Sequence, residues 1–423
     1  MNNLPKNWCE CKLEDCVEII LGQSPKSETY NDKEDGIPFF QGKADFGTIY
    51  PNVRFYCNKP SKIAKNGDIL LSIRAPVGAV NISNLNCCIG RGLAALRGKG
   101  NIQNNFVYFL IKAYEIILHQ QSTGTTFDAI TGNALKNINI ILPPIEEQGR
   151  IVEKIEELFS DIDNGIKDLK TAQAQIKQYR QSVLKSAFEG KLYKTSEWKE
   201  VKLEDVCQIN PKTEIKDMKD DDIVSFLPMT SVKAECNYYT EENVLYSKVK
   251  KGYTKFKNGD VLFAKITPCM ENGKVCIVDN LIQDIGFGST EFHILRCLNN
   301  IIPKYVYYVV IQQCFRKKAK KNMVGAVGQQ RVPADFMKNF DILLPSLLEQ
   351  QQIVAEIEKR FLVADELEKA VNEGLEKADK LKQSILKKAF EGKLVPQDPN
   401  DEPASALLDR IKKEQKPTKG KKK

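Results

Sequence analysis

Histidine is scarce in this sequence: His119 and His293 are the only two in 423 residues. Because histidine is the commonest general acid or base and the commonest metal ligand, this scarcity disfavours a histidine-based catalytic site and a zinc site. No apolar stretch approaches the roughly 18 residues that a membrane-spanning helix needs. The start of the chain also lacks the basic and apolar segments of a secretory signal. We therefore expect a cytoplasmic protein.

Twelve cysteines are present, but no two of them form a C-x-x-C pair. Neither histidine has a second candidate ligand at metal-binding spacing. The simplest interpretation is that the cysteines are reduced and pack as small apolar residues. We predict neither a metal site nor a disulfide.

The reactive motifs of common enzymes are also missing. There is no phosphate loop, and the segment 286–290 lacks the third glycine of a dinucleotide-binding loop. The Asn/Asp-Pro-Pro-aromatic tetrapeptide of amino-methylating DNA methyltransferases is absent. The E-x-K pattern at 414–416 resembles that of many nucleases, but it lies in a lysine-rich end without an upstream Pro-Asp. We expect no catalytic residue in this chain.

Length and composition predict a multi-domain globular protein. Hydrophobic residues make up 42% and charged residues 28%, which is typical of folded domains. A chain of 423 residues is long enough for two or three domains. The net charge of +8, from 63 basic and 55 acidic residues, permits contacts with nucleic acid without establishing them.

The most informative feature is an internal repeat. Residues 142–193 and 344–395 align without a gap, and 21 of the 52 positions are identical. Both copies begin with Leu-Pro, contain the run Ile-Val, and end in Ala-Phe-Glu-Gly-Lys-Leu. Chance does not give such agreement over 52 residues, so the sequence contains a duplication.

Each copy has the seven-residue periodicity of a coiled-coil seam. One apolar row recurs every seven residues in each copy: Ile155, Ile162, Leu169, Ile176 and Val183, then Ile357, Ala364, Val371, Ala378 and Ile385. We place a second row three residues after the first, at Leu158, Ala172, Tyr179, Leu367 and Leu381, with interruptions at Arg360 and Gly374. A seam of this length needs a partner helix, and the other copy is the obvious candidate.

The segments that precede the helical copies repeat more loosely. Asn66-Gly67-Asp68 matches Asn258-Gly259-Asp260, and both segments carry short β-branched runs and turn signals. We predict an α+β protein: two mixed α/β domains separated by two long helices packed as an antiparallel coiled coil, with a pseudo-two-fold internal repeat. The predicted boundaries are 1–141 and 194–343 for the domains, 142–193 and 344–395 for the helices, and 396–423 for a basic tail.

The helical repeats resemble the central and distal repeats of type I restriction–modification specificity subunits. The resemblance rests on LPPIEEQGRIVEKIEELF and LPSLLEQQQIVAEIEKRF, each followed by AFEGKL, and extends over essentially the whole chain. Ile89-Gly90-Arg91-Gly92-Leu93 and Ser289-Thr290-Glu291-Phe292 are similar to motifs of the target-recognition domains in that family. Gly149 departs from the pattern, since the second copy has Gln351.

The resemblance implies a non-catalytic subunit that recognises double-stranded DNA. Each recognition domain would bind one half of a bipartite target, and the helices would set a non-specific gap of fixed length. Two modification subunits, which bind S-adenosylmethionine, would methylate adenine. A restriction subunit that uses ATP and Mg²⁺ could join them. The chain itself would hold no cofactor. Two other classes stay open: a scaffold with a coiled-coil spacer, and a fused methyltransferase or nuclease.

Candidate DNA-binding residues are the basic and small polar positions of each half, since phosphate contacts usually outnumber base contacts. They are Lys43, Arg74, Arg91, Thr123, Thr125, Thr126, Lys265, Lys317, Lys318, Gln329, Gln330 and Arg331. Five helix residues that we expect to be exposed are candidates for the partner surface, with local capping as the alternative: Glu147, Gln148, Arg150, Glu349 and Gln350.

Overall fold

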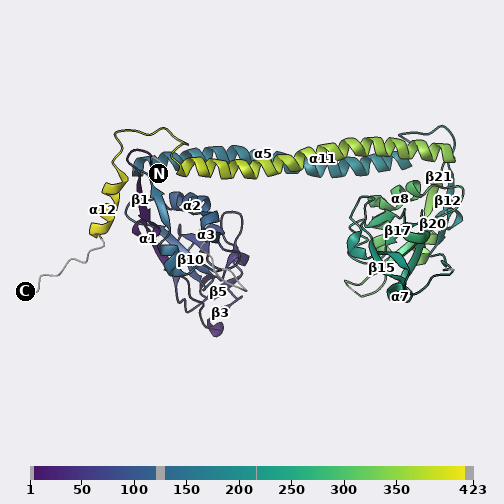
Figure 1. Cartoon of the computed structure of the whole chain (residues 1–423), viewed down its shortest axis with the longest axis horizontal. Helices are drawn as coiled ribbons and strands as arrows, with labels where there is room; N and C mark the ends of the chain where they lie inside the picture. Colours follow the sequence, from purple (N-terminus) through teal and green to yellow (C-terminus); the bar gives the residue numbers. More distant parts are fainter. Residues whose placement is uncertain (1–3, 121–128, 216, 327, 415–423) are drawn as a thin grey trace, which may run out of the picture. The chain divides into compact units, whose positions relative to one another are not determined.

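The computed structural model describes residues 4–120, 129–215, 217–326 and 328–414. The chain divides into two compact units. The first unit comprises Met1–Leu169 and Glu373–Lys423, and the second comprises Lys170–Asn372. Each unit contains a mixed α/β globular part and one half of each of two long helices (Figure 1).

Short strands make up most of the globular part of the first unit: β1 (Cys9–Lys12), β2 (Val17–Leu21), β3 (Tyr30–Asn31), β4 (Ile37–Phe40), β5 (Phe55–Cys57), β6 (Ile63–Ala64), β7 (Ile69–Ser72), β8 (Val80–Ile82), β9 (Cys87–Ile89), β10 (Leu93–Gly98) and β11 (Asn139–Leu142). One sheet has the order β2-β10-β7-β8 and is antiparallel throughout. A second has the order β3-β5-β4-β9-β6, in which β4 and β9 run parallel. A third pairs β1 with β11.

The second unit repeats this arrangement with β12 (Lys199–Lys202), β13 (Cys207–Ile209), β14 (Ile223–Leu227), β15 (Glu242–Leu245), β16 (Thr254–Lys257), β17 (Val261–Ala264), β18 (Val275–Ile277), β19 (Ile285–Gly288), β20 (Phe292–Cys297) and β21 (Asp341–Leu344). The order β13-β20-β17-β18 corresponds to β2-β10-β7-β8, and β15-β14-β19-β16 corresponds to β5-β4-β9-β6. Again one pair, β14 with β19, is parallel. The duplication predicted from the helices therefore extends to the strand topology of both globular parts.

Short helices complete each unit. In the first they are α1 (Leu13–Cys16), α2 (Asn104–Ala113), α3 (Glu115–Gln120) and α4 (Gly132–Lys136), with 3-10 turns η1 (Ser27–Thr29) and η2 (Lys43–Asp45). In the second they are α6 (Leu203–Val206), α7 (Tyr246–Val249), α8 (Pro303–Ile311), α9 (Gln313–Lys321) and α10 (Ala334–Lys338), with η3 (Met229–Ser231) and η4 (Ile282–Asp284). The turn before β7 needs glycine, because Gly67 has φ +87°; Gly259, before β17, has φ +83°.

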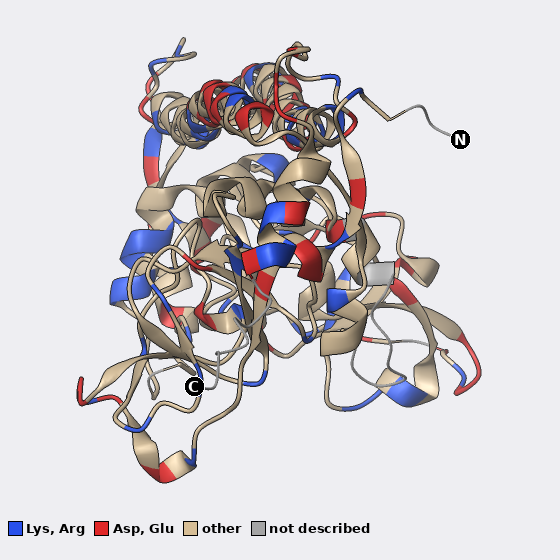
Figure 2. Ribbon diagram, turned by 90° about the vertical axis from the view of Figure 1, so that its left-hand side faces the viewer, with Lys and Arg blue, Asp and Glu red and all other residues tan. Residues whose placement is uncertain are grey.

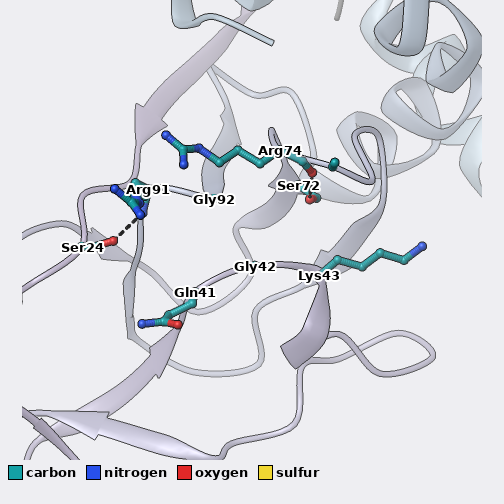
Figure 3. A pocket seen from close by; sticks show the side chains of 9 residues that line it. Ser24, Gln41, Gly42, Lys43, Ser72, Arg74, Arg91 and Gly92 are labelled. Carbon is teal, nitrogen blue, oxygen red and sulfur yellow. Dashed lines mark hydrogen bonds between the residues drawn. The ribbon is translucent and has the colours of Figure 1, made fainter. Parts of the chain in front are cut away.

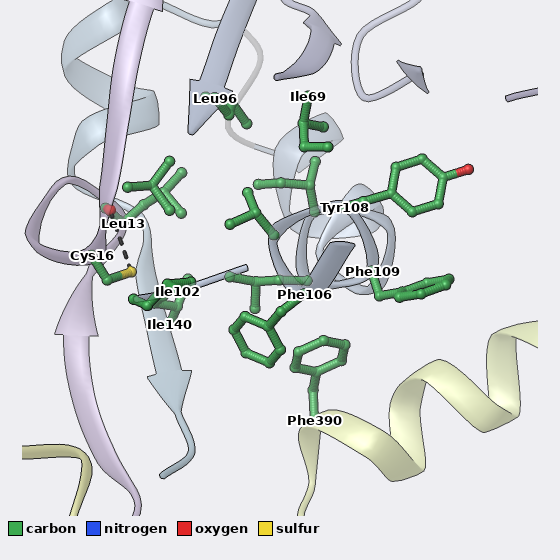
Figure 4. Close-up of a cluster of buried hydrophobic side chains, with 14 of the residues drawn as sticks. Leu13, Cys16, Ile69, Leu96, Ile102, Phe106, Tyr108, Phe109, Ile140 and Phe390 are labelled. Atoms are coloured by element: carbon green, nitrogen blue, oxygen red, sulfur yellow. Dashed lines mark hydrogen bonds between the residues drawn. The ribbon is translucent and has the colours of Figure 1, made fainter. Parts of the chain in front are cut away.

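The core of the first unit lies between the β2-β10-β7-β8 sheet, α2 and the long helices (Figure 4). The all-apolar run Ile69–Leu71 is fully buried, as expected for a central strand. Phe106 on α2 packs against Phe390, with 5.7 Å between ring centroids. Each such buried side chain contributes roughly 1.5–3 kcal/mol relative to an exposed one.

The two long helices are α5 (Ile145–Phe188) and α11 (Leu347–Phe390), each of 44 residues. In the first unit Asp163 on α5 pairs with Lys382 on α11, Oδ1 to Nζ at 2.5 Å. In the second unit Arg180 pairs with Asp365, Nη2 to Oδ1 at 2.6 Å. Partner numbers on α11 fall as numbers on α5 rise, so the helices pack antiparallel, as predicted (Figure 1).

The first row of the predicted seam is buried or half-buried in both helices. The predicted second row is confirmed only in part: Leu158 and Ala172 are half-buried, but Tyr179 is 41% exposed, and Leu367 and Leu381 are each 52% exposed. Where it is wrong, a row four residues after the first is half-buried instead, and it includes Phe159, Arg180, Phe361 and Lys382. The ammonium of Lys382 lies 5.1 Å from the centroid of the Phe159 ring, and the guanidinium of Arg180 lies 5.1 Å from that of Phe361. Long cationic side chains fill this row by covering aromatic rings, which an apolar pattern does not predict.

A helix that the sequence pattern did not predict, α12 (Ala404–Glu414), forms within the segment interpreted as a basic tail. Its buried residues are Ala404, Leu407, Leu408 and Ile411, which join the core of the first unit. Polar residues outnumber apolar ones in this helix, so composition alone indicates a tail, and the apolar stripe gains its meaning from the surface that it covers.

Among the helices that the structure describes, none is long and apolar enough to cross a membrane. All twelve cysteines lie within the described residues and are free thiols. The described residues contain no group of three or more His, Cys, Asp or Glu side chains arranged to hold a metal ion.

Candidate nucleic-acid interface

The first unit carries a cleft of about 240 Å³ where loops from both of its larger sheets meet (Figure 3). Three predicted DNA-binding residues line it: Lys43, Arg74 and Arg91. Ser24, Gln41 and Ser72 add polar groups. The sequence pattern therefore selected residues that are far apart in the chain and that folding brings to one place.

Glycine allows these loops to approach one another. A Cβ on Gly92 would lie 2.4 Å from the carbonyl oxygen of Gln41, so only glycine fits there. The backbone N–H of Gly90 donates to Phe40 O at 2.8 Å, and that of Ile73 donates to Gly92 O at 2.9 Å. These bonds tie the connection between β9 and β10 to the ends of β4 and β7. The backbone at Arg91 and Arg74, next to the bonded residues, is thus held at the rim of the cleft.

The cleft is electropositive. Its lining contains no carboxylate. Lys43, Arg74 and Arg91 are exposed, and none of them forms an ion pair with a described residue. Unpaired, exposed cations beside backbone amides and short hydroxyls suit a phosphate group, which accepts hydrogen bonds from both.

The same place in the second unit is identified by matching backbone hydrogen bonds. Lys265 N donates to Glu291 O at 2.9 Å, as Ile73 N does to Gly92 O. Val332 N donates to Lys265 O at 2.9 Å, as Ile130 N does to Ile73 O at 3.0 Å. Lys265 and Glu291 therefore correspond to Ile73 and Gly92. An isolated bridge joins Ile266 to Arg331 where the first unit joins Arg74 to Ala129.

Here the predicted residue Arg331 is paired with a carboxylate. Its Nη2 donates to Glu291 Oε1 at 2.7 Å, and its Nε donates to Oε2 at 2.9 Å. Hydrogen bonds from Arg331, together with its charge and that of Lys265, lower the pKa of Glu291 below its usual value. The carboxylate is therefore ionised at neutral pH, and this site is less positive than the cleft of the first unit.

The model of the family described as "Type I restriction modification DNA specificity domain" matches residues 5–171 and 195–377. The chain belongs to this family. Each match covers one globular part with its helix start, in agreement with the duplicated topology.

Curated specificity subunits resemble the chain to different extents. A putative type I restriction enzyme MjaX specificity subunit from Methanocaldococcus jannaschii is 39% identical over 195 residues, and the match spans only 45% of each protein. The type I restriction enzyme EcoKI specificity subunit from Escherichia coli is 26% identical over 458 residues, covering 99% of this chain and 98% of that subunit.

Among solved structures, the HsdS subunit from Thermoanaerobacter tengcongensis matches with a TM-score of 0.51 and 19% identity. The match covers 92% of this chain and 98% of that one. This likeness confirms the predicted fold class.

The other candidate DNA-binding residues of this specificity-family chain lie in more than one place. Lys317 and Lys318 lie on α9, where the Lys318 ammonium sits 5.3 Å from the centroid of the Phe340 ring and Lys317 lines a separate cavity with Gln181. Gln329 and Gln330 directly precede Arg331 in the chain. Thr123, Thr125 and Thr126 lie outside the described residues. Figure 2 shows Lys and Arg interspersed with Asp and Glu along the ribbon, so total charge alone does not mark the interface.

The predicted partner residues are not exposed, and this expectation is wrong. Glu147, Gln148, Glu349 and Gln350 are buried, each with at most 2% of its surface exposed, and Arg150 is half-buried. The first turn of α5 is covered by Trp8 and by the segment at Asp401, and that of α11 is covered by the segment at Thr195 and Ser196. These side chains serve intramolecular bonds instead. Gln148 Nε2 donates to Pro143 O at 2.9 Å, and Gln350 Nε2 donates to Pro345 O at 3.0 Å.

The two buried glutamates occupy equivalent positions in the repeat, but their pKa values shift in opposite directions. Glu147 accepts one hydrogen bond, from the indole N–H of Trp8 at 2.8 Å, and burial raises its pKa. Glu349 accepts from the hydroxyl and amide groups of Thr195 and Ser196, which hold its pKa well below the usual range. Local capping, the alternative that the sequence left open, therefore describes Glu349, which also accepts from Ser346 Oγ at 3.1 Å.

Glu291 is the residue that charge-based selection missed. It belongs to the motif Ser289-Thr290-Glu291-Phe292, which carried part of the family resemblance. A selection of cations and small polar residues excludes glutamate, so the motif is the one signal in the sequence that points to Glu291.

Proposed function

We propose that this chain is the DNA sequence-specificity subunit of a type I restriction–modification complex. Each unit recognises one half of a bipartite target, and α5 and α11 fix the length of a non-specific gap. The observation that carries the proposal is the convergence of Lys43, Arg74 and Arg91 in a cleft without carboxylates, in a chain of the DNA specificity family. Unpaired cations at a loop cluster are what the phosphates of duplex DNA require.

The chain acts through partner subunits in this proposal. Two modification subunits bind S-adenosylmethionine and methylate adenine, and restriction subunits that use ATP and Mg²⁺ can join them in the cytoplasm. The recognition segments are 1–141 and 194–343, and the helical spacers are 142–193 and 344–395. Since the predicted partner residues at the helix starts are buried or half-buried, we propose that the modification subunits dock on other surfaces of the chain.

The deciding experiment compares methylation-aware genome sequences of the source cell with the gene intact and deleted. We expect one bipartite methyl-adenine motif to disappear on deletion, which would name both half-sites. If no motif changes, the complex is reconstituted with its modification subunits and tested for sequence-specific binding. Absence of specific binding in the reconstituted complex would favour a scaffold. Turnover by the isolated chain would instead indicate a fused enzyme.

A further inference from the structure

The two units carry different charges at the same place in the fold. Matching hydrogen bonds and bridges show which positions correspond in the two units: Lys265 corresponds to Ile73, Glu291 to Gly92, and Arg331 to Ala129. Two cations of the first cleft are in turn replaced by uncharged residues at the corresponding positions of the second unit. Ile266 stands in the position of Arg74, since each forms the matching bridge. Thr290, the residue before Glu291, stands in the position of Arg91. The framework is conserved between the units, and the charged groups are replaced.

The carboxylate in the second unit is held in a defined geometry. Two N–H groups of Arg331 donate to Glu291: Nη2 donates to Oε1 at 2.7 Å, and Nε shares its hydrogen between Oε2 at 2.9 Å and Oε1 at 3.1 Å. A carboxylate offers about four acceptor positions, so one remains for another donor. Arg331 Nη1 also donates to Gln329 O at 3.1 Å, and the guanidinium keeps further N–H groups. The Glu291 side chain is 24% exposed and the Arg331 side chain 43%, so both groups are accessible to a ligand.

A carboxylate at a DNA-facing loop is unsuited to phosphate, because like charges repel. It is suited to the exocyclic amino groups of cytosine and adenine, which donate hydrogen bonds in the major groove. A neighbouring arginine offsets the charge repulsion and presents donors next to the acceptor. The first unit has no carboxylate in its cleft, so this mode of base recognition is not available there.

We propose that Glu291, fixed by Arg331, selects one base pair of the second unit's half-site by accepting a hydrogen bond from the exocyclic amino group of a base. The proposal rests on the DNA-specificity function given above and names the residue that determines part of it. Glu291 contacts the base, and Arg331 is the positioning residue.

The test uses the full chain reconstituted with its modification subunits and a duplex library in which each position of the bipartite target is varied. Glu291→Gln keeps the size of the side chain but removes its charge and half of its acceptor capacity. Glu204→Gln, on the exposed surface of α6, makes the same charge change where the structure shows no ion pair. Trp198 fluorescence on urea unfolding checks that both variants fold.

We expect Glu291→Gln to reduce discrimination at one base pair of one half-site by about tenfold or more, and to leave the other half-site unchanged. Glu204→Gln should preserve the wild-type pattern. If Glu291 only neutralises Arg331, the variant will instead bind all duplexes more tightly, with a steeper salt dependence and an unaltered motif. That result, or an unchanged motif and affinity, would overturn the proposal. A wild-type complex without any bipartite preference would refute the proposed function itself, which is a distinguishable outcome.

Discussion

Arg150, near the start of α5, forms an ion pair with Asp401, which lies 251 positions later in the chain; Nη2 and Oδ2 are 2.5 Å apart. The Asp401 side chain is only 6% exposed, and its backbone carbonyl accepts a hydrogen bond from Asn7 Nδ2 at 3.2 Å. Ala404 N donates to Asn7 O at 2.9 Å. These bonds hold the segment that leads into α12 against the start of α5 and against Asn7, near the start of the globular part.

Arg150→Ala should therefore destabilise the first unit by about 2–3 kcal/mol, because it leaves the nearly buried Asp401 carboxylate without its counterion. Urea unfolding followed by Trp8 fluorescence in a Trp198→Phe background would measure this, since the chain has one tryptophan in each unit. Arg410→Ala, on the exposed face of α12 beside Glu402, is the matched control and should have little effect. Equal losses in the two variants would contradict the assigned role of Asp401.

Asp68→Asn should also destabilise the first unit, by about 2–3 kcal/mol. The Asp68 side chain is 1% exposed and accepts two hydrogen bonds from Arg97, both at 2.7 Å, and one from Lys65 N, also at 2.7 Å. The same measurement on Glu18→Gln gives the control, because that exposed carboxylate pairs with the same guanidinium and should contribute below about 1 kcal/mol. A larger effect at Glu18 than at Asp68 would refute the ranking by burial.

The second unit should lose stability as the pH falls below 6.5. Burial lowers the pKa of His293 from 6.5, and the positive charge of Lys265 acts in the same direction. The Nε2–H donates to Val332 O at 2.8 Å, and Nδ1 accepts from Asn210 Nδ2 at 2.9 Å, which fits the neutral ring. Because the unfolded state binds a proton more readily, stability is complete above pH 6.5 and falls as the pH drops towards the folded-state pKa.

Urea unfolding at pH 7.5 and 5.5, read by Trp198 fluorescence in a Trp8→Phe background, isolates this effect. His293→Gln should remove most of the difference between the two pH values. The lowered pKa values of Glu291 and Glu349 act below pH 4.5 and so do not interfere. A pH dependence that persists undiminished in the variant would assign it to other groups.

DNA binding by the reconstituted complex should become less salt-dependent when the first cleft loses two cations. The double substitution Arg74→Ala and Arg91→Ala should reduce the slope of log K against log salt by about 1.8, since each phosphate contact contributes roughly 0.9. Lys177→Ala, an exposed lysine on α5, is the control. An unchanged slope in the double variant would show that the cleft does not contact phosphates.

Local signals in the sequence were sufficient for much of the architecture. The ungapped repeat of 52 residues predicted both long helices, because helix periodicity and end signals depend on residues close together in the chain. Turn glycines such as Gly67 and Gly259 likewise fix the turns before β7 and β17. The family resemblance needed only these motifs. Lys43, Arg74 and Arg91 were selected by residue type alone, without any indication that they would line one cleft.

Other features depended on contacts between distant residues. Glu147 and Glu349 have equivalent sequence contexts, yet one accepts from Trp8 and the other from Thr195 and Ser196, so their pKa values shift in opposite directions. The leucine at 381 is exposed while Lys382 occupies the seam, because an aromatic ring on the partner helix accommodates its ammonium.

The sequence by itself determined the duplicated helices, the mixed α/β class and the specificity family, because these follow from periodicity and motif spacing. Only the tertiary structure decided which charges are free and which are neutralised. Arg91 and Arg331 are both arginines beside the corresponding sites of the two units, but only Arg331 has a carboxylate within hydrogen-bonding distance among the described residues. Whether a charge is paired depends on the neighbours that folding supplies. Backbone hydrogen bonds between segments far apart in the chain, rather than local sequence, place Glu291 beside Arg331.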